Sequence, residues 1–575
     1  MKPHPDHSSE FVIPISYGST EVIETGKWGF QKPQTSFMTA PCQESCPAGN
    51  SIPQFIYFVS EGRYDEALQV LLKENPFPGI CGRVCIHPCE PDCNRSQYDE
   101  SVSIRSLERH VFDRASNQLP EVEPFSDQHS RDVAIVGSGP AGLSCAYFLK
   151  LLGHRATVFE SKKEPGGVMR WGIPEYRLPK RVLRREIKRL VDLGIEIRTG
   201  VQVGKDVSWA ELDRFDSIFL SPGAGLNASL GIRGEELKKV WKGGDFLEQI
   251  NSGETLKLGT QVIVIGGGNT AMDVARSALR LGSRVTVAYR RTKTEMPAIK
   301  EEISEAEEEG IRFEFLVQPV SVHSVRRGKL AVRFQRMKLG SLDQSHRPAA
   351  IRIRGSFITL EADCVIAAVG EGVDLSWIPK ELVKDNVIDV NSAPRIFAGG
   401  DAVAQPRAVI TAIASGKKAA ISMDSHFRGY PVDEVLSRVR VGKKGALSME
   451  TYLSGREEAK WPEAKEIVTY EQINTLFFPP AKRVEARRQN RERVLKGFLE
   501  VNLGFSSSKA KQSALRCFTC GTCNYCYNCY FFCPEGVISL DPSQRMKTVD
   551  LEHCKGCGTC AKACPRNVVE MKEVG

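Results

Sequence analysis

The chain has 575 residues, of which 41% are apolar and 26% are charged. This length exceeds one hydrophobic core and predicts three or four domains of about 150 residues each, and the composition excludes a largely disordered chain. The formal net charge of +8 is concentrated between residues 481 and 516, where ten Lys or Arg face three Glu. This favours a basic linker or docking surface over a nucleic-acid-binding domain, so no nucleic-acid partner is expected.

The N-terminal residues show no basic segment followed by an apolar segment, and no apolar run reaches the roughly 18 residues of a membrane span. We therefore expect a cytoplasmic protein without a membrane span. Sixteen of the 18 cysteines lie in two tight clusters near the ends of the chain. In a reducing compartment such clusters favour metal ligation over disulfides.

The N-terminal part of the chain predicts an arm followed by a small domain. Residues 1–30 are polar and contain Pro and Gly, which indicates an extended arm. Residues 31–125 contain six cysteines and stretches in which apolar residues recur at spacings of three and four. This pattern predicts a helical domain. A joint rich in Pro, Asp and Ser follows at 119–130.

Two stretches about 130 residues apart, "DVAIVGSGPAGL" and "QVIVIGGGNTAM", each read as strand, Gly-rich turn and helix, and each is followed by another strand. Such βαβ units predict an α/β fold with two Rossmann-like domains built on parallel sheets. We assign 130–228 and 375–430 to one domain and 229–374 to a second domain inserted into it. Residues 431–510 are expected to be a basic linker, and 511–575 an α+β ferredoxin-like domain.

The first Gly-rich turn predicts a dinucleotide site. Glycines at such positions let backbone N–H groups approach a pyrophosphate at the helix N-terminus, and an acid at the end of the next strand accepts hydrogen bonds from ribose hydroxyls. The residues concerned are Gly137, Gly139, Pro140, Ala141, Gly142 and Glu160.

The second turn repeats the pattern without the acid. Its residues are Gly266, Gly268, Asn269, Thr270 and Ala271. Tyr289 stands where the acid would be, and Arg290 and Arg291 follow it. Two cations in place of an acid favour the 2′-phosphate of NADPH over NADH. Arginines at a strand end are also commonly just solvated, so both nucleotides stay open.

The stretch "RIFAGGDAV" contains Gly400 and Asp401, and Gly416 lies on the helix that follows. It resembles the second flavin-binding stretch of flavoproteins with two dinucleotide domains. The resemblance implies FAD at the first turn and the nicotinamide at the second, with Gly166, Gly167 and Gly223 completing the flavin set. The two cysteines outside the clusters, Cys145 and Cys364, are expected to be buried, so no redox-active pair is expected beside the flavin.

The C-terminal cysteines fit two copies of C-x2-C-x2-C-x3-C-P, in which the fourth cysteine of each run serves the other 4Fe-4S cluster. One predicted cluster has the ligands Cys523, Cys526, Cys529 and Cys564. The other has Cys554, Cys557, Cys560 and Cys533. Zinc is the disfavoured alternative. Cys517 and Cys520 remain as free thiols, a spare half-site or packing residues.

The N-terminal cysteines, with "CQESCPAGN", "NPFPGICGRVCIHPCEPDC" and "YRRTKTEMPA", resemble the glutamate synthase small subunit and its relatives over about residues 40–430. The resemblance implies a 4Fe-4S cluster held by Cys46, Cys85, Cys89 and a helical carboxylate, Glu108. A second cluster of that family needs a C-x-x-C upstream of Cys42, which is absent here. We therefore expect three 4Fe-4S clusters in all.

These features imply an NAD(P)H:acceptor oxidoreductase in which FAD and the clusters carry electrons, with no catalytic acid or nucleophile of its own. The architecture is similar to DsrL, a flavoprotein of sulfur metabolism, which makes dissimilatory sulfite reductase the first partner expected at the ferredoxin domain. A partnership with a glutamate synthase large subunit is the alternative. A third reading, of another class, is a ferredoxin-docking or assembly module with structural nucleotides. The sequence does not decide whether the chain forms a homodimer.

Overall fold

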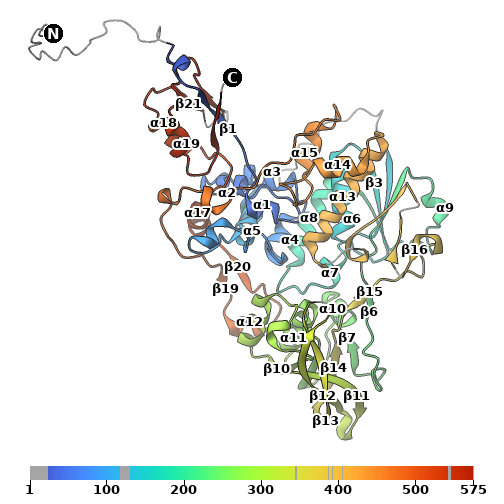
Figure 1. Ribbon diagram of the computed structural model, residues 1–575. Coiled ribbons are helices and arrows are strands. Elements are labelled where there is room, and N and C mark those ends of the chain that lie inside the picture. Colours follow the sequence, from blue (N-terminus) through green and yellow to red (C-terminus); the bar gives the residue numbers. More distant parts are fainter. Residues whose placement is uncertain are drawn as a thin grey trace, which may run out of the picture. The chain divides into compact units, whose positions relative to one another are not determined.

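The computed structural model describes residues 24–116, 130–343, 346–385, 387–390, 393–403, 406–541 and 546–573. Residues 1–23 of the expected arm and 119–129 of the expected joint lie outside these ranges. The chain divides into two compact units (Figure 1). Unit 1 comprises Met1–Thr39, Val468–Pro479 and Phe518–Gly575, and unit 2 comprises Ala40–Ile467 and Pro480–Cys517. In the described ranges no helix has both the length and the apolar character needed to cross a bilayer.

Unit 1 contains the expected ferredoxin-like domain and begins earlier in the chain than expected. Its elements are β1 (Gln31–Thr35), α18 (Asn528–Phe531), β21 (Ile538–Asp541), β22 (Met546–Val549), α19 (Thr559–Lys562) and β23 (Val569–Glu573). β21 pairs with β22, and β1 pairs antiparallel with β23. Residues 31–39, which we expected in the N-terminal domain, therefore belong to this unit, because β1 satisfies the backbone groups of β23.

Unit 2 begins with the expected helical domain. Its helices are α1 (Pro41–Glu44), α2 (Ile52–Ser60), α3 (Tyr64–Leu72), α4 (Pro78–Val84) and α5 (Ile104–Arg114). Proline stands in the first turn of α2 and α4, where its missing N–H costs no helical hydrogen bond. α2 buries Phe55, Ile56 and Val59 almost completely, and α17 (Ser507–Leu515) packs against α2 and α5.

The first dinucleotide domain has a parallel sheet in the order β18-β5-β2-β3-β4. Its strands are β2 (Asp132–Val136), β3 (Arg155–Glu160), β4 (Glu196–Thr199), β5 (Ser217–Leu220) and β18 (Ile396–Ala398). Its helices are α6 (Pro140–Leu151), α7 (Val168–Trp171), α8 (Lys180–Asp192), α9 (Trp209–Leu212) and α13 (Val409–Phe427). The pairs β15 (Glu371–Gly372) with β6 (Leu226–Asn227), and β16 (Val383–Lys384) with β17 (Val387–Ile388), are short antiparallel ladders.

The inserted domain has a second parallel sheet in the order β10-β9-β8-β14-β7 and an antiparallel sheet β11-β12-β13. The parallel strands are β7 (Val240–Lys242), β8 (Gln261–Ile265), β9 (Arg284–Tyr289), β10 (Arg312–Phe315) and β14 (Cys364–Ala367). The antiparallel strands are β11 (Val317–Ser324), β12 (Leu330–Leu342) and β13 (Pro348–Ala362), and the helices are α10 (Gly243–Asn251), α11 (Asn269–Arg280) and α12 (Lys300–Glu309). Alternate residues of β8 enter two different cores: Val262 and Val264 pack with the helices, and Ile263 and Ile265 with the antiparallel sheet. Burial on both faces explains the uninterrupted apolar run of β8.

The segment expected to be a basic linker, 431–510, is divided between the units: 431–467 and 480–510 belong to unit 2, and Val468–Pro479 belongs to unit 1. It contains α14 (Val432–Arg438), α15 (Met449–Gly455), α16 (Arg491–Leu495), and the paired strands β19 (Arg487–Arg488) and β20 (Asn502–Gly504). Its cations have acidic partners in two domains: Arg483 pairs with Glu90, Arg516 with Asp99, and Arg488 with acidic side chains of α12. These three cations are therefore paired with acids of unit 2.

Candidate functional site

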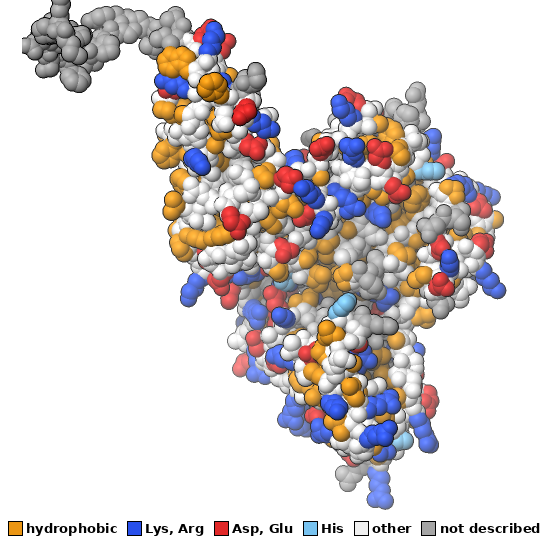
Figure 2. Space-filling model, in the orientation of Figure 1, with side chains coloured by type: hydrophobic (Ala, Val, Ile, Leu, Met, Phe, Trp, Pro, Cys, Tyr) orange, Lys and Arg blue, Asp and Glu red, His pale blue; other side chains and the backbone are white. Residues whose placement is uncertain are grey.

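A cavity of about 950 Å³ lies at the junction of the two dinucleotide domains. Figure 2 shows hydrophobic side chains around this hollowed junction, above the region of β11–β13. The predicted site residues that line the cavity are Pro140, Asp401, Gly266, Gly268, Asn269, Thr270, Arg290 and Arg291. The fold thus brings residues of both predicted nucleotide sites to one space.

The first Gly-rich turn joins β2 to α6, and its backbone packs so closely against other backbone atoms that side chains would not fit at two of its positions. Gly137 has φ of 100°, and a Cβ there would lie 2.4 Å from the carbonyl oxygen of Ser221. A Cβ on Gly142 would lie 1.9 Å from the carbonyl oxygen of Gly137, whereas a Cβ on Gly139 would meet no atom within 4 Å. Gly137 and Gly142 are therefore required for the turn itself, and Gly139 leaves the helix N-terminus open to a ligand.

Glu160 lies at the end of β3, where the sequence predicts a ribose-binding acid. Its Oε2 accepts hydrogen bonds from the backbone N–H and the hydroxyl of Ser138, and its Oε1 accepts one from the N–H of Lys162 at 2.8 Å. The side chain is buried, and these donors fix it beside the Gly-rich turn.

The remaining glycines of the predicted flavin set serve mainly to bring backbones together. A Cβ on Gly416 would lie 2.3 Å from the carbonyl oxygen of Ala141, so this glycine allows α13 to contact α6. A Cβ on Gly167 would lie 2.7 Å from the Cα of Gly139. Gly166, Gly223 and Gly400 all have positive φ, which favours glycine for conformational reasons.

Asp401 lies beside the cavity with a second carboxylate, Glu371, that the sequence did not single out. Burial raises the pKa of Asp401, against the opposing charge of Arg407. Burial and the charge of Asp401 raise the pKa of Glu371. The guanidinium of Arg407 donates to the carbonyl oxygens of Asp401 and Glu371, at 3.2 and 2.6 Å, and so ties the two segments together.

The second Gly-rich turn follows the geometry of the first. Gly266 has φ of 146°, and a Cβ there would lie 2.2 Å from the carbonyl oxygen of Ala368. Gly268 leaves open space, Ala271 is buried under the turn, and Asn269 accepts a hydrogen bond from the N–H of Ile299 at 2.9 Å. Asn269 therefore has a structural bond in addition to its place at the cavity.

The two arginines that follow β9 differ in their surroundings. Arg290 is exposed at the cavity, as expected of a phosphate ligand. Arg291 is buried, with 2% of the residue exposed, and its guanidinium pairs with Asp343 and donates to the carbonyl oxygen of Pro348 at 2.6 Å. Arg291 thus binds protein groups that the sequence did not indicate.

Three of the N-terminal cysteines surround a second, smaller pocket. Cys46, Cys85, Cys89 and Glu108 all line it, with Asn50 and Arg105. Cys81 is buried with its thiol 3.9 Å from the Asn75 carbonyl oxygen, and neither it nor Cys42 is among the residues that line this pocket. The four predicted ligands therefore converge, although they come from three separate segments.

Glu108 is a buried carboxylate without a cationic partner among the groups that shift its pKa. Burial raises this pKa to about 8, and hydrogen bonds from the amides of Asn75 and Asn50, at 2.9 and 3.2 Å, oppose the rise. Burial likewise raises the pKa of the Cys46 thiol to about 11. A group of buried thiols and a carboxylate suits a positively charged iron core, which would compensate their negative charge.

The nucleotide cavity and the cysteine pocket share a wall. Val84 and Ile86 line the cavity, whereas Cys85 between them lines the cysteine pocket. On the opposite segment, Val409 lines the cavity and Ile410 the pocket. At each of these places, residues adjacent in the sequence line the two sites.

The C-terminal cysteines of unit 1 line two further pockets in the predicted interleaved register. Cys523, Cys526, Cys529 and Cys564 line one pocket. Cys533, Cys554, Cys557 and Cys560 line the other. Among the residues that the structure describes, no group of three or more His, Cys, Asp or Glu side chains converges as a single metal ion requires. Each set takes three cysteines from one run and the fourth from the other run, which is the arrangement of two-cluster ferredoxins.

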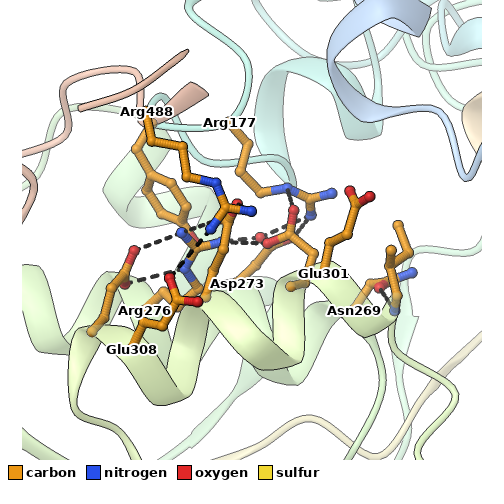
Figure 3. Close-up of polar contacts among 12 residues, drawn as sticks. Arg177, Asn269, Asp273, Arg276, Glu301, Glu308 and Arg488 are labelled. Atoms are coloured by element: carbon orange, nitrogen blue, oxygen red, sulfur yellow. Dashed lines mark hydrogen bonds and ion pairs between the residues drawn. The ribbon is translucent and has the colours of Figure 1, made fainter. Parts of the chain in front are cut away.

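Several residues of the site carried no signal in the sequence. Arg177 and Asp273 line the cavity as an ion pair, and Arg276, Glu302 and Arg488 continue this network along α11 and α12 (Figure 3). Arg347 and Arg352 of the β12–β13 hairpin also line the cavity. Asp273 and Arg276 lie on α11, which the second Gly-rich turn opens. The other residues are far from both Gly-rich turns in the sequence, so only the fold brings them to the site. Cys145 and Cys364 are buried, as expected.

Three family models match the chain. They are Pyridine nucleotide-disulphide oxidoreductase (residues 131–416), Dihydropyrimidine dehydrogenase domain II, 4Fe-4S cluster (residues 36–119), and 4Fe-4S dicluster domain (residues 522–569). The matches indicate that the chain binds FAD and NAD(P)H between 4Fe-4S domains at its two ends. Among solved structures, FprA of Mycobacterium tuberculosis in complex with NADPH is 22% identical with a TM-score of 0.44, over 58% of this chain and 87% of that one.

Two curated relatives align with this chain over most of their own length. The NADPH-Fe(3+) oxidoreductase subunit beta of Geobacter sulfurreducens is 35% identical over 523 residues, which are 83% of this chain and 75% of the relative. The small chain of the NADPH glutamate synthase of Escherichia coli is 35% identical over 411 residues, which are 66% of this chain and 87% of the relative. The chain therefore belongs to the family of NADPH-dependent iron-sulfur flavoprotein oxidoreductases that includes the small chain of glutamate synthase.

Proposed function

We propose that this oxidoreductase transfers electrons between NADPH and a protein acceptor, with the N-terminal cluster next to the flavin and the two C-terminal clusters facing the acceptor. FAD supplies the exchange between a two-electron hydride and one-electron carriers, which the clusters require. The direction of transfer in the cell follows from the potentials of the partners and is left open.

The shared wall at Val84–Ile86 is the observation that carries this proposal. A cluster held by Cys46, Cys85, Cys89 and Glu108 would lie next to the cavity proposed for the flavin and the nicotinamide, since residues adjacent in the sequence line both sites. The side chains of the wall at 84, 86, 409 and 410 are all aliphatic, so they would keep water out of this short path.

The residues of the cavity have binding and orienting roles in this proposal. The two helix N-termini after Gly139 and Gly268 would bind the pyrophosphates of FAD and NADPH, and Glu160 the ribose of FAD. Asp401 and Arg407 would fix the segment that contacts the flavin. No side chain of the cavity is assigned the role of a nucleophile or a general base.

Unit 1 has features of an electron outlet. Tyr530, Phe531 and Phe532 are exposed large apolar side chains in the segment between Cys529 and Cys533, and Phe531 has 75% of its surface exposed. Aromatic side chains of this kind are enriched at protein interfaces. The sequence resemblance makes dissimilatory sulfite reductase the first partner to test.

The glutamate synthase partnership is the second candidate, and the coverage of 87% of the Escherichia coli small chain favours it. The two candidates differ in what the purified chain should reduce or bind. Association with a large subunit that contains a glutaminase region would favour the second.

An anaerobic titration with NADPH tests the proposal. Absorbance should report reduction of the flavin, and electron paramagnetic resonance should report reduced 4Fe-4S centres. A protein that binds NADPH but shows neither change would instead fit an assembly module with structural nucleotides.

A further inference from the structure

Arg291 ties the tip of the β12–β13 hairpin to the end of β9. Its Nε donates to the carbonyl oxygen of Pro348 at 2.6 Å, and its Nη2 pairs with the carboxylate of Asp343. The N–H of Asp343 donates in turn to the carbonyl oxygen of Arg347 at 2.8 Å, which closes the tip. Because the Arg291 guanidinium is buried in these bonds, its main contacts are with the hairpin.

The tie brings Arg347 near Tyr289, because both side chains reach the same backbone carbonyl. Nη1 of Arg347 lies 3.5 Å from the carbonyl oxygen of Glu295, which also accepts a hydrogen bond from the Tyr289 hydroxyl at 2.9 Å. Tyr289 is the residue that replaces the ribose-binding acid at the end of β9. Arg290, Arg347 and Arg352 all line the cavity.

The charges around this corner favour an anion. Asp343 is paired with Arg291, and the Glu295 carboxylate accepts hydrogen bonds from the N–H and the hydroxyl of Thr292, so both acids already have partners. A phosphate here would meet cations from two segments that are more than 50 residues apart in the sequence.

We propose that Arg347, with Arg290, binds the 2′-phosphate of NADPH, and that Arg291 is a positioning residue that holds the hairpin in place for this contact. The inference rests on the proposed function, because it assumes that the second Gly-rich turn takes the nicotinamide nucleotide. It assigns the preference for NADPH to a hairpin residue in addition to the arginine at the end of β9.

Calorimetric titration of the intact, FAD-loaded protein with 2′,5′-ADP and with 5′-ADP measures how much the 2′-phosphate contributes to binding, because the two ligands differ only in this group. Arg347→Ala should weaken 2′,5′-ADP binding by about 10- to 100-fold, the range for a lost hydrogen bond to a charged group. The affinity for 5′-ADP should stay the same, which also shows that the variant is folded. Arg354→Ala is the matched control, because Arg354 is exposed on β13, the strand that follows Arg347, and is not among the residues lining the cavity.

An equal loss of affinity for both ligands, or no loss for 2′,5′-ADP, in Arg347→Ala would overturn the assignment. Asp343→Asn tests the positioning role by the sign of its effect. Removal of a negative charge should strengthen phosphate binding if the charge alone matters, whereas loss of the hairpin tie should weaken it several-fold. We expect weaker 2′,5′-ADP binding, and stronger binding would refute the role of Arg291.

These outcomes are distinct from failure of the proposed function. If wild-type protein binds 2′,5′-ADP more tightly than 5′-ADP but NADPH does not reduce the flavin, the electron-transfer proposal fails and the phosphate site stands. If NADPH reduces the flavin and Arg347→Ala keeps full affinity for 2′,5′-ADP, only the phosphate assignment fails.

Discussion

Arg177 and Asp273 form a buried ion pair that joins the two dinucleotide domains. Nη1 of Arg177 lies 2.8 Å from Oδ2 and 3.0 Å from Oδ1 of Asp273, and 10% and 7% of the two side chains are exposed. Arg177 precedes α8 of the first domain, and Asp273 lies on α11 of the inserted domain. Because both side chains also line the cavity, the pair holds together the space in which the two nucleotides would meet.

Replacement of Arg177 should therefore destabilise the folded protein. Arg177→Ala leaves the Asp273 carboxylate buried without its main cationic partner, and we expect the free energy of unfolding of the inserted domain to fall by about 3–5 kcal/mol. Urea denaturation followed by fluorescence measures this change. Arg155→Ala is the matched control, since the Arg155–Asp132 pair is exposed and should contribute at most about 1 kcal/mol. Equal effects of the two substitutions would contradict a special role for the buried pair.

Iron analysis should distinguish the N-terminal cysteines that bind iron from those that do not. We expect about twelve irons in the wild-type chain, as three 4Fe-4S clusters require. Cys46→Ser should lose about four of them, whereas Cys81→Ser should keep all, because Cys81 is buried and is not among the residues that line the pocket of Cys46. About sixteen irons in the wild type, or equal losses in both variants, would show that the ligand assignment is wrong.

Glu108 is expected to be the fourth ligand of the N-terminal cluster. Glu108→Cys keeps a negatively charged ligand and should retain the iron, but it should change the paramagnetic resonance spectrum of one cluster only. Glu108→Ala should lower the iron content towards that of Cys46→Ser. If both variants keep the wild-type spectrum and iron content, Glu108 serves only to accept the hydrogen bonds from Asn50 and Asn75.

The lowered pKa of the Asp424 carboxyl group predicts that the stability of the protein depends on pH. Burial alone would raise its pKa, but hydrogen bonds from His154 and Tyr452 and the charge of Arg456 lower it to about 2. A carboxyl group whose pKa is lowered on folding stabilises the protein above its unfolded pKa, near 4, and loses this effect as the pH falls towards 2. Asp424→Asn should therefore cost about 2–3 kcal/mol at pH 7.

The same comparison at lower pH checks the cause of that cost. Urea titrations of the wild type and Asp424→Asn should show a difference in unfolding free energy that shrinks as the pH is lowered from 4. A difference that stays constant down to the lowest pH at which the protein folds would mean that the carboxylate charge does not matter. His154 Nε2 lies 2.9 Å from Oδ1 of the same carboxylate, so His154→Gln should reproduce part of the loss.

The local motifs could be predicted from the sequence because each is encoded within about 30 residues. The Gly-rich turns lie between strand and helix as expected, and Cys523–Cys533 and Cys554–Cys564 line two pockets in the register that the Cys-Pro endings indicate. The continuous apolar run 262–265 of β8 likewise indicated a parallel sheet, and the run is buried on both faces.

The contacts between distant segments could not be predicted in the same way. The pairing of β1 with β23, the ion pair of Arg177 with Asp273 and the place of Arg347 at the cavity depend on the tertiary fold. The basic residues 481–516 look like a linker in the sequence because acidic partners such as Glu90 and Asp99 are 393 and 417 residues away from Arg483 and Arg516. The sequence shows how many cationic residues a segment contains, but the acidic residues that pair with them depend on the fold.

We propose that NADPH reduces a flavin, which then passes electrons to the adjacent N-terminal cluster. Anaerobic stopped-flow absorbance of the intact, cofactor-loaded chain tests this electron path most directly. After mixing with NADPH, the account predicts bleaching of the flavin band first and bleaching of the broad iron-sulfur absorbance afterwards. In Cys46→Ser the flavin should still bleach, and the later phase should be slower or smaller. No flavin bleaching in the wild type, or a cluster phase that Cys46→Ser leaves unchanged, would contradict the account.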